Sequence, residues 1–257
     1  DEADVLVYNT CTVRRSAEDR LAGHLGDAAR LKRQDPQRVV LVTGCVPQAE
    51  QERFFARFPY VDGALGPQNV HKLPELLAAA EAGAARDAPP AFFEDGGHFS
   101  GDLPSRRERP FQAWVQVMSG CTNFCSYCVV PYVRGPERSR TAHDIVAEVR
   151  HLVADGVREV TLLGQNVNAY GGDLPSAGSA PQAPTSFAGL LVLLDTLTGI
   201  ERIRFMTSHP KDLSPELVDA IAGLRTVCEH VHLPAQSGSD AVLGTMRRGY
   251  GRRDYLQ

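Results

Sequence analysis

The chain has 257 residues, of which 43% are hydrophobic and 23% are charged, which suits one large or two ordinary folded domains. Its net charge of −4 does not indicate nucleic-acid binding by the chain as a whole, and no apolar run approaches the roughly 18 residues of a membrane helix. Six cysteines without a secretory hydrophobic segment indicate a reducing, cytoplasmic compartment.

The first third of the sequence alternates apolar runs with amphipathic stretches. We expect strands at 4–8, 38–43 and 61–65 and helices at 18–32, 49–58 and 73–82. This repeat predicts a parallel sheet with helical crossovers. Cys11 and Cys45 each follow the carboxyl end of a predicted strand, the edge at which open parallel sheets bind ligands. A ligand role for these thiols competes with ordinary packing of a small apolar side chain.

Residues 84–110 are predicted to form a linker, because paired prolines and glycines precede a basic run. The alternation then resumes, with strands predicted at 111–118, 159–163, 203–206 and 230–233. Helices are expected after the N-caps Thr141 and Ser214 and from Phe187. Polar or cysteine-bearing loops follow these strands, as in barrel enzymes whose sites lie at the strand C-termini.

The most informative motif is the C-x3-C-x2-C run of Cys121, Cys125 and Cys128. Three thiolates this close can hold three irons of a 4Fe–4S cube and leave the fourth iron open to a small molecule. A structural zinc ion would need a fourth nearby ligand, and a disulfide framework would spread its cysteines through a small secreted domain. We predict an iron–sulfur cluster here, with zinc or plain structural cysteine as the remaining alternatives.

Over nearly its whole length, the sequence resembles the radical S-adenosylmethionine (SAM) methylthiotransferases. Besides the cysteine run, the segments that carry the resemblance are 9–14, 43–45, 66–67, 129–135, 139–140, 162–168, 207–210 and 233–240. Val-Val-Pro-Tyr-Val-Arg-Gly at 129–135 and Gly-Gln-Asn-Val-Asn at 164–168 are most similar to the MiaB type, which modifies tRNA.

The resemblance implies an α/β fold with two parts. Residues 1–83 would be an N-terminal parallel-sheet (Rossmann-like) methylthiotransferase domain, and residues 111–257 a partial radical-SAM (βα) half-barrel after the linker. Cys121, Cys125 and Cys128 would hold a SAM-chelating 4Fe–4S cluster. Cys11 and Cys45 would be two of three ligands of an auxiliary 4Fe–4S cluster. Cys11 and Cys45 would be the second and third of these ligands, and the cysteine that is the first would precede Asp1. A C-terminal TRAM domain would follow, so we expect an internal fragment of a longer protein.

The resemblance also implies a reaction: insertion of sulfur and a methyl group at C2 of N6-isopentenyladenosine next to the tRNA anticodon. The clusters and SAM would carry the radical chemistry, so no catalytic side chain is assigned. The implied SAM-binding residues are Tyr127, Gln165, Asn166, Ser208 and Gln236. The expected contacts to substrate and tRNA are Arg134, Arg138, Arg140 and Ser237. An electron donor such as flavodoxin or ferredoxin and a monomeric state are expected, and His209 is either a proton carrier or structural.

Two other functions remain open from the sequence. One is the RimO-type methylthiotransferase, which acts on an aspartate of a ribosomal protein. The other is a non-catalytic iron–sulfur module that binds RNA. Arginines occur in local groups along the sequence. Such groups fit a tRNA-modifying enzyme or an RNA-binding module, because guanidinium groups bind phosphates. Solvated surface arginines are an equally good explanation for each group alone.

Overall fold

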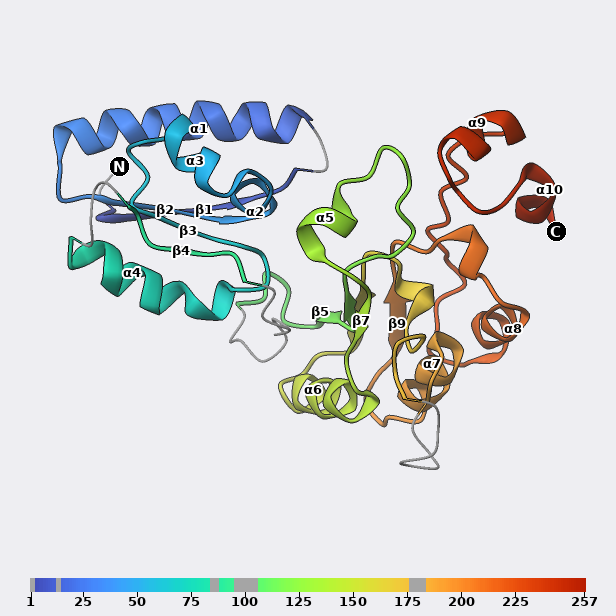
Figure 1. Cartoon of the computed structure of the whole chain (residues 1–257). Coiled ribbons are helices and arrows are strands. Elements are labelled where there is room, and N and C mark those ends of the chain that lie inside the picture. Colours follow the sequence, from blue (N-terminus) through green and yellow to red (C-terminus); the bar gives the residue numbers. More distant parts are fainter. Residues whose placement is uncertain (1–2, 13–14, 84–87, 95–105, 176–183) are drawn as a thin grey trace. The chain divides into compact units, whose positions relative to one another are not determined.

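The computed structural model describes residues 3–12, 15–83, 88–94, 106–175 and 184–257. The chain divides into two compact units, Asp1–Ser100 with Tyr132–Arg134 and Gly101–Pro131 with Gly135–Gln257. Each unit contains parallel strands connected by helices, so the α/β class predicted from the sequence is confirmed (Figure 1). Within the described ranges, no helix combines the length and the apolar content needed to cross a bilayer.

The first unit contains a four-stranded parallel sheet in the order β1-β2-β3-β4. Its strands are β1 Val5–Thr10, β2 Val39–Gly44, β3 Gly63–Leu65 and β4 Ala91–Phe92. Its helices are α1 Arg15–Gln34, α2 Cys45–Glu50, α3 Glu52–Arg57 and α4 Leu73–Glu81, with a short 3-10 turn at Val70–Lys72 before α4. In Figure 1, α1 and α4 lie on opposite faces of this sheet.

All six residues of β2 are buried, because both faces of the sheet are covered. Val40 belongs to the apolar cluster that contains Leu25 of α1, whereas its neighbour Leu41 belongs to the cluster that contains Leu76 of α4. Alternate side chains of a strand point to opposite faces. The unbroken apolar run of β2 is therefore what a strand buried on both sides requires.

Two predictions in this unit differ from the structure. The helix expected at 49–58 is divided into α2 and α3 at Gln51, whose φ of 49° lies in the left-handed region. Part of the expected linker 84–110 forms β4, which pairs in parallel with β3. A strand of two residues is too short to give a periodic pattern in the sequence. Residues 84–87 and 95–105 of the expected linker lie outside the described residues.

The second unit contains a three-stranded parallel sheet in the order β5-β8-β9 and a two-stranded antiparallel ribbon, β6-β7. The strands are β5 Gln112–Gln116, β6 Met118–Ser119, β7 Arg138–Ser139, β8 Glu159–Leu163 and β9 Arg202–Phe205. The helices are α6 Ala142–Ala154, α7 Phe187–Asp195, α8 Pro215–Gly223, α9 Asp240–Thr245 and α10 Arg252–Leu256. Short helical segments of this unit occur at Val167–Ala169 and Pro210–Asp212, and the short helix α5 Val130–Arg134 is divided between the two units after Pro131.

Side-chain hydroxyls begin the helices as the sequence predicted. Thr141 Oγ1 accepts a hydrogen bond from the N–H of Asp144 at 3.2 Å at the start of α6. Ser214 Oγ accepts one from the N–H of Leu217 at 3.2 Å at the start of α8. Each cap satisfies one of the backbone donors that a helix leaves unpaired at its N-terminus.

Apolar side chains of α6, α7 and α8 form one core with alternate residues of the three-stranded sheet. Ile145, Leu190, Leu191, Val160 and Ile203 are all fully buried in it. On β5, Trp114 points away from this core and is 65% exposed. The helices thus cover one face of the sheet, and the strand ends are left to position polar loops.

The strand predicted at 230–233 is wrong. The described structure has a single parallel bridge between Ile203 and Val227 instead. Val231 and Leu233, the apolar residues that suggested the strand, are only half-buried. Alternating apolar residues specify a strand only where one face is buried, because burial is what fixes the register.

We predict that Leu191→Ala lowers the free energy of unfolding by about 2–5 kcal/mol, because it removes a fully buried side chain and leaves a cavity. Val192→Ala is the control on the same helix, since Val192 is 50% exposed, and it should change stability by less than about 0.5 kcal/mol. Urea unfolding followed by circular dichroism measures both. Equal effects of the two substitutions would contradict the assigned packing of α7.

Candidate functional site

Backbone groups hold the loop after β6, which carries the three cysteines of the C-x3-C-x2-C run. The N–H of Gly120 donates to Oε1 of Gln165 at 2.6 Å, and the N–H of Cys121 donates to the carbonyl of Gly135 at 3.1 Å. Gly120 has φ +79°, and a Cβ there would lie 1.9 Å from the carbonyl oxygen of Pro136. Only glycine therefore fits where this loop passes the backbone of residues 135–136.

The far side of the loop is fixed to the end of α9. The N–H of Ser126 donates to the carbonyl of Met246 at 3.1 Å. Phe124 holds φ +46°, a left-handed conformation that is rare for a bulky side chain and is typical of functional loops. A further hydrogen bond, from the N–H of Cys128 to the carbonyl of Cys125 at 2.9 Å, closes the turn between the second and third cysteines.

The three thiols lie close enough for their charges to influence one another. Cys121 is 9% exposed and Cys125 is 8% exposed, while Cys128 is half-buried. Burial raises the pKa of the Cys121 thiol, a hydrogen bond from the backbone of Asn123 lowers it, and the charges of Glu137, Cys128 and Cys125 raise it again. The loop therefore gathers three sulfur atoms in a partly desolvated place.

The thiols of the cysteine loop are a donor set that an iron–sulfur cluster can use. All six cysteines are described, and none forms a disulfide. Within the described residues, no three His, Cys, Asp or Glu side chains are arranged to hold one metal ion. The ligands of zinc must converge on one point at about 2.3 Å for sulfur, whereas each thiolate of a 4Fe–4S cube binds a different iron. Three thiols on one short loop offer one ligand to each of three irons of such a cube.

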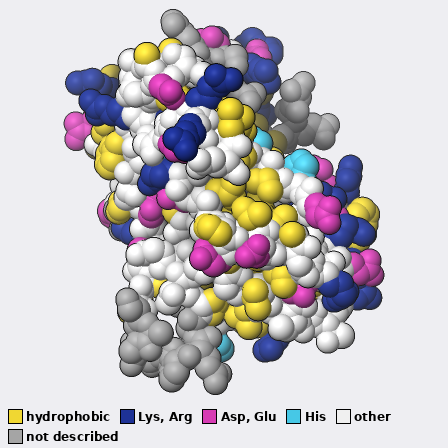
Figure 2. Space-filling model, turned by 90° about the vertical axis from the view of Figure 1, so that its right-hand side faces the viewer, with side chains coloured by type: hydrophobic (Ala, Val, Ile, Leu, Met, Phe, Trp, Pro, Cys, Tyr) yellow, Lys and Arg dark blue, Asp and Glu magenta, His cyan; other side chains and the backbone are white. Residues whose placement is uncertain are grey.

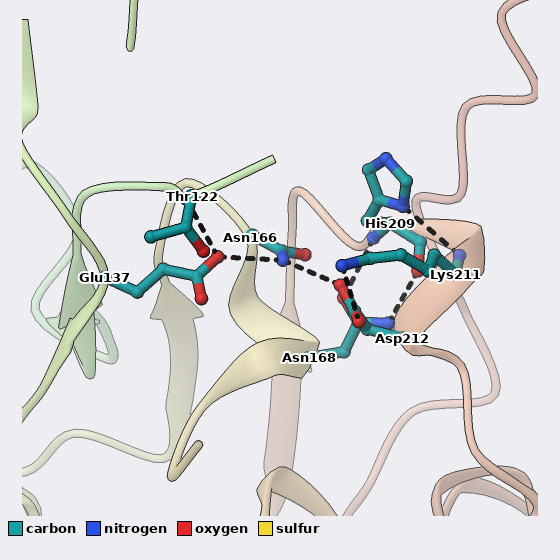
Figure 3. Close-up of polar contacts among 7 residues, drawn as sticks. All are labelled: Thr122, Glu137, Asn166, Asn168, His209, Lys211 and Asp212. Atoms are coloured by element: carbon teal, nitrogen blue, oxygen red, sulfur yellow. Dashed lines mark hydrogen bonds and ion pairs between the residues drawn. The ribbon is translucent and has the colours of Figure 1, made fainter. Parts of the chain in front are cut away.

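Polar side chains from the ends of β8 and β9 meet beside this loop (Figure 3). Nδ2 of Asn166 donates to Oε1 of Glu137 at 3.2 Å and to Oδ2 of Asp212 at 2.8 Å. Glu137 Oε1 also accepts from the N–H of Thr122 at 3.3 Å, and Lys211 Nζ lies 3.4 Å from Oδ1 of Asp212. One buried amide thus bridges two carboxylates that come from different loops.

A cavity of about 490 Å³ lies beside these groups. Polar side chains make up much of its lining: Thr122, Glu137, Asn168, Asp173, Lys211, Asp212 and Ser214. Carboxylates accept hydrogen bonds from hydroxyl or ammonium groups and an ammonium donates to a carboxylate, so the cavity suits a polar ligand that carries both kinds of group.

Three buried polar atoms at the same strand ends have no hydrogen-bond partner among the described residues. They are Oδ1 of Asn166, Oγ of Ser208 and Nε2 of His209, whose side chains are each less than one tenth exposed. A buried polar atom without a partner costs roughly 1–3 kcal/mol. Their concentration at one edge marks a place where a bound molecule would supply the missing partners.

His209 is held by Asn168 through two backbone hydrogen bonds. The N–H of His209 donates to Oδ1 of Asn168 at 2.8 Å, and Nδ2 of Asn168 donates to the carbonyl of His209 at 2.9 Å. Burial lowers the pKa of His209 to about 4, Arg248 and Lys211 lower it too, and Asp212 opposes them. His209 is therefore neutral at physiological pH, and its Nδ1 accepts from the N–H of Lys211 at 3.2 Å.

The five residues predicted to bind SAM come from several segments of the second unit. Asn166 and Ser208 are buried at the ends of β8 and β9, and Gln165 holds the cysteine loop through Gly120. Tyr127 is 52% exposed within the loop. Gln236 is exposed on the segment before α9 and has φ +65°; no hydrogen bond of the described residues joins it to the other four.

Among the predicted tRNA contacts, Arg140 is buried and binds other groups of the protein. It is 4% exposed, its Nη1 donates to the carbonyl of Gln116 at 2.9 Å, and it forms an ion pair with Glu148. A buried guanidinium occupied in this way is not available to phosphate, which corrects the expectation. Arg134, Arg138 and Ser237 are half-buried. Figure 2 shows Lys and Arg side chains in separate groups, with acidic side chains among them, on the face it presents.

In the first unit, the register of the sheet places the residues that precede Cys11 and Cys45 side by side. Thr10 pairs with Gly44 at the ends of β1 and β2, and each cysteine is the next residue of its chain segment. Thr10 Oγ1 donates to the carbonyl of Thr43 at 2.8 Å, which locks the two ends together. Cys11 is exposed and Cys45 is buried. The sheet thus pairs the residues that precede the two cysteines, and their shared role as ligands stays a prediction.

The sequence profile of the radical SAM superfamily matches residues 115–257. The chain belongs to the radical SAM superfamily. A second profile, described as the uncharacterized protein family UPF0004, matches residues 1–66. Among solved structures, the radical SAM methyltransferase TsrM from Kitasatospora setae, with cobalamin and a [4Fe-4S] cluster bound, has a TM-score of 0.64. It is 16% identical, and the match covers 99% of this chain and 53% of that one, so this likeness is one of fold.

The similar curated relatives are named tRNA-2-methylthio-N(6)-dimethylallyladenosine synthase. The protein from Geobacter metallireducens is 48% identical over 256 residues, which cover 100% of this chain and 56% of the relative. That from Geotalea uraniireducens is 49% identical over 255 residues, which cover 99% of this chain and 56% of the relative. The chain thus spans just over half the length of these relatives.

No role was assigned to Glu137, Asp212 or Arg248 from the sequence. Glu137 lies between the recognised segments 129–135 and 139–140, and Asp212 follows 207–210, so proximity to these motifs was the available signal. For Arg248 the sequence carries no signal that distinguishes it from Arg247, because only packing buries one and exposes the other.

We predict that Gly120→Ala prevents the cysteine loop from closing. The new methyl group would meet the carbonyl of Pro136, and a left-handed conformation adds about 1–3 kcal/mol of strain for a residue with a Cβ. The iron bound per chain after anaerobic reconstitution should fall well below that of the wild type. Gly223→Ala is the control, since its Cβ would meet no atom within 4 Å. Iron content equal to wild type in Gly120→Ala would refute the assigned loop geometry.

The low pKa of His209 predicts a loss of stability in acid. The unfolded histidine titrates near 6.5 and the folded one near 4, so between these values the unfolded state binds more protons. Stability should fall as pH drops through that window, by up to about 1.4 kcal/mol per pH unit from this group, and the group contributes nothing above it. Urea unfolding at several pH values measures the slope. His209→Gln should flatten it relative to wild type, and parallel curves would contradict burial of a neutral imidazole.

Proposed function

We propose that the chain is part of a tRNA methylthiotransferase, which inserts sulfur and a methyl group at C2 of N6-isopentenyladenosine next to the anticodon. The observation that carries the proposal is a sequence identity of 48–49%, over essentially the whole chain, to relatives whose names state a methylthiotransferase reaction on tRNA. The cysteine loop at the C-terminal end of the radical SAM sheet agrees with it. The named relatives act on tRNA, so we favour this over the RimO-type reaction on a ribosomal-protein aspartate and over a non-catalytic RNA-binding module.

The proposal assigns a role to each part of the chain. Residues 1–83 are the N-terminal methylthiotransferase domain, 84–110 a linker that includes the short β4, and 111–257 the radical SAM domain. Cys121, Cys125 and Cys128 hold a 4Fe–4S cluster with one iron left for SAM. Cys11 and Cys45 contribute to a second 4Fe–4S cluster, a role that their places directly after the paired ends of β1 and β2 support. When bound, these groups supply the one-electron chemistry and the sulfur.

In this proposal, side chains of the protein bind SAM and hold the cysteine loop in position. Gln165 fixes the cysteine loop through the N–H of Gly120, which keeps the thiolates in position. Asn166 and Ser208, with their unpartnered buried oxygens, contact the polar groups of SAM. Tyr127, exposed between the second and third cysteines, lies beside the adenine, and Gln236 completes the SAM contacts from the segment before α9.

The tRNA contacts that we propose are Arg134, Arg138 and Ser237, because cationic and hydroxyl side chains bind phosphate and sugar. Arg140 is omitted, since Glu148 already neutralises it. An anticodon loop can present a base unstacked, which is how RNA bases are usually read. Flavodoxin or ferredoxin as electron donor, a monomeric state and a cytoplasmic location complete the proposal.

The first test is cluster loading and SAM cleavage by the anaerobically reconstituted full-length protein. With dithionite, the wild type should release 5′-deoxyadenosine, while Cys125→Ala should lose that activity and the iron of one cluster. Cys228→Ala is the matched control, since Cys228 lies outside the loop, and it should keep both. A wild type that binds iron but releases no 5′-deoxyadenosine would favour the non-catalytic module.

The second test addresses the substrate. Mass spectrometry of bulk tRNA from a deletion strain should show loss of the methylthio group from N6-isopentenyladenosine, restored by the wild-type gene and not by Cys125→Ala. An intact tRNA mark together with an unmodified ribosomal-protein aspartate would overturn the proposal in favour of the RimO-type reaction.

A further inference from the structure

Arg248 is a buried cation without a carboxylate partner. Its side chain is 5% exposed, although it lies on the short segment between α9 and α10. Among the ion pairs of the described residues, none includes Arg248, whereas the other deeply buried arginine, Arg140, is paired with Glu148. An unpaired buried charge is strongly destabilising, so a compensating negative charge is required close to this guanidinium.

Two of the three acceptors around the Arg248 guanidinium, the Cys125 sulfur and the Tyr127 hydroxyl, belong to the cysteine loop. Nη1 of Arg248 lies 3.3 Å from Sγ of Cys125 and 3.3 Å from the hydroxyl oxygen of Tyr127. The third acceptor is the hydroxyl oxygen of Tyr250, 3.5 Å from Nε, and the ring of Tyr250 lies 5.4 Å from the guanidinium carbon. Of these three neighbours, only the cysteine sulfur can carry a full negative charge at neutral pH as a metal ligand.

The backbone is arranged to deliver this side chain. Arg247 has φ +57° and Gly249 has φ +70°, so the chain turns sharply on either side of Arg248. The N–H of Arg248 donates to the carbonyl of Leu243 at 3.0 Å, which anchors the turn to α9. Left-handed backbone at a residue other than glycine costs free energy and is retained where it positions a side chain.

We propose that Arg248 is a positioning residue for the cluster that the cysteine loop holds. It donates to the Cys125 thiolate from outside the ligand set and supplies the positive charge that offsets the cluster. This inference rests on the cluster assignment of the proposed function. Hydrogen bonds and charge near the cysteine sulfurs set the potential of an iron–sulfur cluster. A positive charge stabilises the reduced, more negative form, so Arg248 raises the midpoint potential and retains iron in the loop.

The test compares wild type, Arg248→Gln and Arg248→Lys as reconstituted full-length proteins, without tRNA. Arg248→Gln should shift the midpoint potential of the cluster to a more negative value, measured by a redox titration followed by electron paramagnetic resonance. It should also lose iron to a chelator about tenfold faster, the effect of removing one charge-assisted hydrogen bond. Arg248→Lys keeps the charge but lacks the planar guanidinium. Its midpoint potential and its rate of iron loss should lie between those of the wild type and Arg248→Gln.

Arg247→Gln is the matched control, because it removes the same charge from the exposed neighbouring position and should leave the potential and iron release unchanged. Wild-type potential and wild-type iron release in Arg248→Gln would overturn the inference. If Arg248→Gln does not fold, the same two wild-type values in Arg248→Lys would overturn it. A wild-type protein that binds no cluster would instead refute the proposed function, so the two failures are distinguishable.

Discussion

The close approach of the cysteine loop to residues 135–136 is the constraint on which the site depends. Gly120 passes the backbone at a distance that leaves no room for a Cβ, and its N–H is bound to Gln165 at the end of β8. The loop that carries the thiols is thus tied to the strand that carries Asn166. A shift of this crossing would move the cysteines away from the polar strand ends, because both depend on the same contact.

The parallel arrangement of the strands explains why the other site residues lie close together. All carboxyl ends of a parallel sheet lie at one edge, so residues far apart in sequence meet there without long-range signals of their own. Asn166 and Asp212 meet on this principle, whereas Glu137 reaches them from the residue before β7 of the antiparallel ribbon. Oδ1 of Asn166 has no hydrogen-bond partner among the described residues. The same arrangement in the first unit pairs Thr10 and Gly44, the residues that precede Cys11 and Cys45. In both sheets the strands provide the frame and the following loops provide the chemistry.

The sequence allowed the prediction of features whose cause is local. Periodicity located the strands from β1 to β9 apart from the short ones, and the hydroxyl caps at Thr141 and Ser214 were evident because a cap and its helix are neighbours in sequence. The strand expected at 230–233 failed because its alternation finds no buried face. The division of a helix at Gln51 was not predictable, since nothing local requires a left-handed residue there.

The partners of buried charges were the least predictable part of the site. Arg140 and Arg248 are the same residue type, lie among other basic residues in sequence, and are 4% and 5% exposed. Arg140 is neutralised within the fold by Glu148 and so belongs to the scaffold. Arg248 faces the thiol of Cys125 and the hydroxyl groups of Tyr127 and Tyr250, and no ion pair of the described residues includes it. Metal ligation fixes a cysteine as its thiolate, so a metal bound at Cys125 would supply the negative charge that this guanidinium lacks within the described fold.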